Sequence, residues 1–97
     1  MKKLIYIANW KTYLSHAQAV AFCKTHTHEL DQLNKQSQII ICPSFTALLP
    51  LQSSLTSIAV GAQNCSAYKP GAHTGDVDAA SLHDIGVRFC IVGHSEC

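Results

Sequence analysis

Short apolar runs alternate along the chain with longer stretches whose apolar residues recur every three or four positions. The runs span Leu4 to Asn9, Ile39 to Cys42, Ile58 to Ala62 and Arg88 to Val92. Each run is continuously apolar rather than alternating, which is typical of parallel strands that are covered on both faces. We therefore expect four short, buried, parallel strands.

The segment from Ser15 to Leu33 has the periodicity of an amphipathic helix. Ser15 is suited to accept a hydrogen bond from the first turn and so to cap this helix. The stripe expected to pack on the sheet comprises Ala19, Val20, Cys23, Thr27, Leu30 and Leu33.

Two further helices are expected between the later runs. One extends from about Thr46 to Leu55, with its leucines on one side and with Pro50 limiting its first turn. The other is short, is capped by Asp78 and ends at Gly86, which would supply a left-handed residue. The predicted order of elements is βαβαβαβ.

Parallel strands joined by helices cross over right-handedly, so this order yields either a doubly wound sheet or part of a (β/α)8 barrel. Periodicity alone does not choose between them. The first run is followed by Asn9-Trp10-Lys11 and not by a glycine-rich phosphate loop, which argues against a dinucleotide-binding fold.

The composition excludes several classes of protein. The 97 residues carry a formal net charge of +1 and are 47% hydrophobic, which fits one compact domain and gives no long-range attraction to nucleic acid. No apolar run approaches the roughly 20 residues of a membrane span. The five cysteines form no C-x-x-C pair and some lie in apolar runs, as in a reducing compartment. We expect a cytoplasmic protein without nucleic-acid or membrane partners.

Polar side chains follow three of the predicted strands. Ligands bind at the carboxyl ends of strands in doubly wound sheets and in barrels, so these side chains would share one rim. They are Asn9, Trp10 and Lys11, then Gln63 and Asn64, then His94, Ser95 and Glu96. A cation, an imidazole and amides at one rim suit an anionic, oxygen-rich substrate.

The same positions carry a family resemblance. Ala8-Asn9-Trp10-Lys11, Gly61-Ala62-Gln63-Asn64 with Gly71 to Asp76, and Ile91-Val92-Gly93-His94-Ser95-Glu96 resemble triosephosphate isomerase in order and approximate spacing. The resemblance implies a (β/α)8 TIM barrel, a homodimer or higher oligomer, and no metal or organic cofactor. It also implies interconversion of dihydroxyacetone phosphate and glyceraldehyde 3-phosphate in glycolysis and gluconeogenesis.

The resemblance also implies residue roles. Lys11 would offset the charge of the substrate and Asn9 would help to position it, while His94 would polarise the substrate oxygens and Glu96 would support the catalytic site. The loop from Gln63 to Val77, with Asn64 and Thr74, resembles a dimer loop that reaches into the neighbouring subunit.

Each of these residues also has a structural interpretation. Lys11 could be a solvated loop lysine, His94 a packed histidine and Glu96 an exposed acid in the first turn of a helix. Trp10 is interpreted as a packing anchor. The remaining histidines are expected at the surface, because they lack the i, i+4 spacing of a helical metal pair.

A complete barrel of this kind takes about 250 residues, so we expect residues 1–97 to be the N-terminal part of one barrel domain with the C-terminal half absent. By the resemblance, the glutamate that abstracts the substrate proton would then be missing, and this chain alone would have negligible activity. One alternative is a non-catalytic fragment that associates with a complementary half or an intact subunit. A small, monomeric anion-binding module is another. The first and fourth strands would be sheet edges with exposed apolar side chains.

Overall fold

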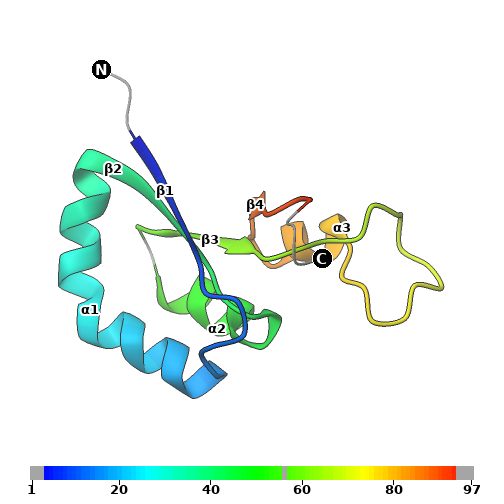
Figure 1. The fold of residues 1–97 in the computed structure, drawn as a ribbon, viewed down its shortest axis with the longest axis horizontal. Helices are drawn as coiled ribbons and strands as arrows, with labels where there is room; N and C mark the ends of the chain where they lie inside the picture. Colours follow the sequence, from blue (N-terminus) through cyan, green and yellow to red (C-terminus); the bar gives the residue numbers. More distant parts are fainter. Residues whose placement is uncertain (1–3, 56, 94–97) are drawn as a thin grey trace.

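The computed structural model describes residues 4–55 and 57–93, which form a curved parallel sheet with helices between its strands (Figure 1). The strands are β1 (Leu4–Asn9), β2 (Ser37–Cys42), β3 (Ala59–Ala62) and β4 (Phe89–Cys90). These confirm the four predicted runs, although β4 is shorter at both ends than the apolar pattern indicated.

The strands lie in the order β1-β2-β3-β4, and every pairing is parallel. A doubly wound sheet reverses its strand order at a switch point, whereas a barrel wall adds each strand beside the one before it. The observed order is that of a barrel wall. This settles the choice that periodicity left open in favour of a partial (β/α)8 barrel.

The first helix, α1 (His16–Gln36), begins as predicted. Ser15 Oγ accepts a hydrogen bond from Gln18 N at 3.3 Å, and Gln18 Oε1 accepts one from Ser15 N at 3.0 Å, so two backbone donors at the helix start are satisfied. Ala19 and Cys23 of the predicted stripe are buried against the sheet.

The prediction that Leu33 faces inward is wrong, because its side chain is 59% exposed. Asn34 takes the inward position at this turn. Its side chain accepts a hydrogen bond from Ile39 N at 3.1 Å and donates one to Ser57 O at 2.7 Å. Since neighbouring residues on a helix point about 100° apart, an inward Asn34 turns Leu33 toward solvent.

The second helix, α2 (Phe45–Ser54), buries Leu48 and Leu51 as expected. The placement of Pro50 in the first turn is wrong, because Pro50 lies inside the helix. In the first turn of a helix a proline is harmless, because the backbone N–H that it lacks would have no partner there. The helix begins at Phe45, so Pro50 lies beyond that turn. The helix ends four residues after Pro50, at Ser54.

The third helix, α3 (Ala79–Asp84), has both predicted ends. Asp78 accepts hydrogen bonds from the Ser81 hydroxyl at 2.7 Å and from Ser81 N at 2.9 Å, and these bonds lower the pKa of the Asp78 carboxyl. Gly86 follows the helix with a φ of 90°, a conformation that glycine adopts without strain.

The hydrophobic core lies between the sheet and the helices. Ile39, Ile41 and Val60 point from the strands into a buried cluster that also contains Ala19, Cys23, Ala47, Leu48, Leu51, Ile58, Ala62, Leu82 and Val87. None of the helices within residues 4–55 and 57–93 has both the length and the apolar composition of a membrane-spanning segment.

Strand β1 departs from the expected coverage on both faces. Its side chains from Leu4 to Ile7 are 56–65% exposed, although its backbone pairs with β2 along the whole strand. Among the described residues, β1 pairs with β2 alone, so its other edge is open. This confirms the prediction that the first strand is a sheet edge with exposed apolar side chains.

Candidate functional site

The carboxyl ends of β1, β2 and β3 meet at one rim of the sheet. The parallel register places Asn9 opposite Cys42, and Trp10 N donates a hydrogen bond to Cys42 O at 3.0 Å just beyond the ladder. The segment that carries Lys11 is thereby fixed to the end of β2.

Lys11 has a left-handed backbone, with a φ of 52°. This conformation costs a non-glycine residue roughly 1 kcal/mol, so it persists only where neighbouring contacts hold it. One such contact is the hydrogen bond that Lys11 N donates to Asn9 Oδ1 at 2.9 Å. Asn9 therefore shapes the turn that presents Lys11. Its side chain is short enough for the oxygen to accept a hydrogen bond from the backbone two residues later.

Gln63 supplies a second contact, from the end of β3. Its Nε2 donates hydrogen bonds to Lys11 O and, at 3.0 Å, to Cys42 O. One half-buried amide thus joins the ends of three strands and fixes the backbone of Lys11 from the carbonyl side. The sequence interpretation placed Gln63 at the rim and at the start of the dimer loop, but it missed the link to Lys11 and Cys42. Its position directly after an apolar strand was the available signal.

Trp10 packs away from the rim, against α1. Its ring meets Phe22 edge-on with centroids 5.3 Å apart, and Phe22 in turn lies 4.5 Å from the ring of His26. The interpretation of Trp10 as a packing anchor is confirmed. The backbone of Lys11 is therefore held by its packed neighbour Trp10 and by hydrogen bonds with Asn9 and Gln63.

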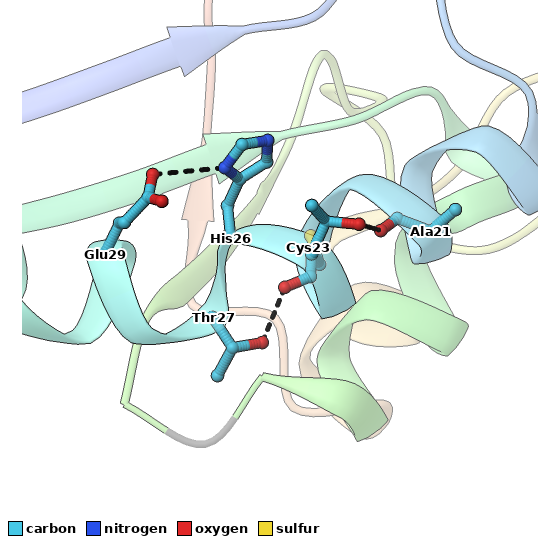
Figure 2. A network of polar contacts seen from close by, with 6 residues as sticks. Ala21, Cys23, His26, Thr27 and Glu29 are labelled. Atoms are coloured by element: carbon cyan, nitrogen blue, oxygen red, sulfur yellow. Dashed lines mark hydrogen bonds and ion pairs between the residues drawn. The ribbon is translucent and has the colours of Figure 1, made fainter.

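The described histidines show no metal arrangement. Figure 2 shows His26 Nδ1 paired with Glu29 Oε2 on the surface of α1, at 3.1 Å. On the same helix the Thr27 hydroxyl donates to Cys23 O. Within residues 4–55 and 57–93, no group of three or more His, Cys, Asp or Glu side chains could hold a metal ion.

His94 and Glu96, the predicted polarising and supporting residues, lie outside the described residues. The chain leading to them can still be followed. Ile91 N donates to Ala62 O at 2.9 Å, which holds the end of β4 beside the end of β3, and Gly93 has a φ of 71°.

The long loop after β3 extends away from the sheet (Figure 1). Ser66 N donates to Val77 O at 2.7 Å and closes the base of the loop. Farther out, His73 stacks on Tyr68 with centroids 4.7 Å apart, while Asn64 and Thr74 are exposed. Thr74 therefore lies in an outlying segment, apart from the rim formed by Asn9, Lys11 and Gln63.

Two thiols near the rim, Cys42 and Cys90, are poor nucleophiles. Burial raises the pKa of Cys42, and it raises the pKa of Cys90 to about 12 together with a hydrogen bond to Cys65. Chemistry at the rim therefore falls to the lysine cation and to amide groups, which suit binding of an anion and stabilisation of developing negative charge.

Comparison with known proteins gives a consistent result. A family model for triosephosphate isomerase matches residues 4–97. The chain is 37% identical to a triosephosphate isomerase of Gloeothece citriformis, 40% to one of Carboxydothermus hydrogenoformans and 39% to one of Dictyoglomus thermophilum. Each match covers 99% of this chain and 41%, 39% and 39% of the respective relative, so the chain spans about two fifths of the length of these proteins.

Proposed function

Because this chain belongs to the triosephosphate isomerase family, we propose that its strand-end rim forms part of a site that interconverts dihydroxyacetone phosphate and glyceraldehyde 3-phosphate. The observation that carries the proposal is the strained backbone of Lys11, held by Asn9 from one side and by Gln63 from the other. A solvated loop lysine would need no such support.

In this proposal Lys11 supplies positive charge to the substrate phosphate and to the enediolate formed when a proton leaves carbon. Two unit charges 4 Å apart at a protein surface attract by about 4 kcal/mol at an effective dielectric constant of about 20. The interaction accelerates the reaction to the extent that it is stronger for the enediolate than for the neutral carbonyl. The hydrogen bonds with Asn9 and Gln63 fix the backbone of Lys11 beforehand, which reduces the reorganisation needed as charge develops.

His94 would donate a hydrogen bond to the substrate oxygens, and Glu96 would support the site beside it. By the family resemblance the base is a glutamate supplied from outside residues 1–97, so we propose that these residues alone give no measurable isomerisation. The reaction moves protons between carbon and oxygen and needs no cofactor.

Thr74 and the loop that carries it are proposed to contact a second subunit of a homodimer. The loop extends from the sheet, is closed at its base by the Ser66–Val77 hydrogen bond, and is stiffened by the Tyr68–His73 stack. Such a preformed, protruding loop is suited to insertion into a partner. The free thiols of Cys23, Cys42, Cys65 and Cys90 support a cytoplasmic location.

A second candidate function is association without catalysis. The open edge of β1 and its exposed side chains from Leu4 to Ile7 favour pairing with further barrel strands, whether these are supplied by a complementary half or by an intact subunit. Mixing residues 1–97 with a polypeptide that corresponds to the uncovered part of a relative would restore isomerisation under the first proposal. Complex formation without turnover would support the second.

The direct test of the isomerase proposal is a chimera. Residues 4–97 would replace the matching segment of the Carboxydothermus hydrogenoformans relative, and kcat/KM for both triose phosphates would be measured. We expect activity in the chimera and a loss of at least ~100-fold in Lys11→Met, the scale seen when one charge-stabilising group is removed from an active site.

The matched control is Lys24→Met, which removes a cation of equal length from the exposed surface of α1, outside both the rim and the protruding loop. It should leave kcat/KM within about twofold. A folded, inactive chimera, or equal losses in the two lysine variants, would contradict the assignment of Lys11 to the site.

A further inference from the structure

Two cysteines from different parts of the chain face a common cavity beside the rim. Cys65, in the loop after β3, and Cys90, in β4, both line a cavity of about 370 Å³. Leu82, Val87 and Phe89 line other parts of this cavity, which is open to solvent. Both cysteines are partly buried and pack against the hydrophobic core.

The fold fixes this proximity. Cys90 is the register partner of Ala62, and Ile91 N donates to Ala62 O at 2.9 Å, so the end of β4 runs beside the end of β3. Cys65 follows Ala62 by three residues. The Ser66–Val77 hydrogen bond then holds the outgoing chain next to α3. Each of the two sulfurs is therefore positioned by backbone contacts on its own segment.

The two thiols lie in one neighbourhood. Cys90 Sγ donates to Ile91 O at 3.3 Å, and the nearby Cys65 side chain contributes, after burial, to raising the pKa of Cys90. Cys42 is the third thiol in this neighbourhood and makes a smaller contribution to raising the pKa of Cys90. Burial and these contacts raise the pKa of Cys90 to about 12, so its proton is retained at neutral pH. A thiol that keeps its proton reacts slowly with an oxidant, so we assign the first oxidation step to Cys65 and the second to Cys90.

We propose that Cys65 and Cys90 are a redox modification site that forms a reversible disulfide when the protein meets a peroxide. The Cys65 thiolate attacks one peroxide oxygen and the O–O bond breaks, which gives a sulfenic acid and releases hydroxide or water. The Cys90 sulfur then attacks the Cys65 sulfur, its proton joins the departing hydroxyl group, and water leaves as the S–S bond forms. The peroxide is reduced by two electrons, and the two thiols are oxidised by two electrons.

The disulfide would connect two segments that lead into the rim. Gln63, which holds Lys11, precedes Cys65 by two residues, and His94 follows Cys90 by four. Oxidation would therefore tie the Gln63 segment covalently to β4. Reduction by a dithiol would release it.

The experiment uses the Cys97→Ser chain, which removes the thiol outside the described residues. The protein is treated with hydrogen peroxide, remaining thiols are alkylated, and peptides are mapped by mass spectrometry with and without dithiothreitol. We expect one intramolecular cross-link between the peptides containing Cys65 and Cys90, with the loss of two hydrogen atoms, reversed by dithiothreitol. This readout needs no variant at the two cysteines themselves.

Single cysteine-to-serine variants identify which thiol forms the cross-link with Cys65. Cys65→Ser and Cys90→Ser should each abolish the cross-link, whereas Cys42→Ser, which removes the third nearby thiol, and Cys23→Ser should retain it. The proposal is overturned if Cys65 and Cys90 both remain alkylatable after peroxide. It is equally overturned if Cys65 proceeds to a sulfinic acid without a cross-link, or if its partner proves to be Cys42 or a cysteine of another molecule.

Discussion

Replacing Gln63 by methionine tests how the rim is held together. Methionine keeps the length of the side chain and removes the amide that donates to Lys11 O and Cys42 O. Each hydrogen bond contributes about 1 kcal/mol net to stability, so Gln63→Met should lower the free energy of unfolding by about 2 kcal/mol. The loss should be centred on Lys11, because Cys42 O keeps the hydrogen bond from Trp10 N.

The assay is urea unfolding followed by circular dichroism, combined with NMR of the backbone. Trp10 is the single tryptophan of the chain, is adjacent to Lys11 and packs on Phe22 of α1, so its one indole resonance is easily assigned and shifts when the segment that carries Lys11 moves against this helix. In Gln63→Met we expect this resonance to move and the backbone shifts of Lys11 to leave the left-handed range.

Gln52→Met is the matched control, because the Gln52 amide donates one hydrogen bond to Gly86 O at 3.0 Å, away from the rim. It should cost about half as much and leave the Trp10 resonance in place. If the two variants cost the same and Lys11 keeps its shifts in both, then Gln63 does not hold the lysine and the argument fails.

Three further predictions concern the scaffold and can be measured by urea unfolding. Ser15→Ala should cost about 1 kcal/mol by removing the capping box of α1, and no loss would contradict that role. Gly61→Ala should cost roughly 1–3 kcal/mol, because its methyl group would lie 2.9 Å from Cys42 Sγ, whereas Gly71→Ala, with no atom nearer than 3.8 Å, should be close to neutral. The pKa of Cys90 is raised from 9.0 to about 12, so its contribution to stability should be complete below pH 9.0 and lost as the pH rises toward 12. Cys90→Val should weaken this alkaline dependence, and an unchanged pH profile would contradict the shift.

The sequence predicted the scaffold well where local rules decide the structure. Ser15 and Asp78 begin helices because their side chains accept hydrogen bonds from the first turn, and Gly86 ends one because glycine adopts the left-handed backbone. Such signals need no tertiary information. Leu33 was misplaced because the inward position at that turn went to Asn34, whose partner Ser57 lies 23 residues away. A pattern along one helix does not contain that contact.

The site could be predicted only in part. Asn9 and Lys11 could be placed at the strand-end rim because they directly follow a predicted strand, while their roles toward a substrate stay predictions. The role of Gln63 could not be derived in the same way, since its amide reaches residues 52 and 21 positions distant, and the sequence alone does not show which carbonyls lie within its reach. The left-handed backbone of Lys11 was also missed. Lysine has no intrinsic preference for a positive φ, and one of the contacts that hold it comes from Gln63, which is distant in sequence.

The central claim is that Lys11 and His94 act on one small phosphorylated substrate from a shared rim. A crystal structure of the chimera with dihydroxyacetone phosphate bound measures this directly. The account predicts Lys11 Nζ and a ring nitrogen of His94 within hydrogen-bonding distance of oxygens on the same ligand molecule. A ligand that contacts neither side chain, or a His94 that points to the opposite end of the strands, would contradict it.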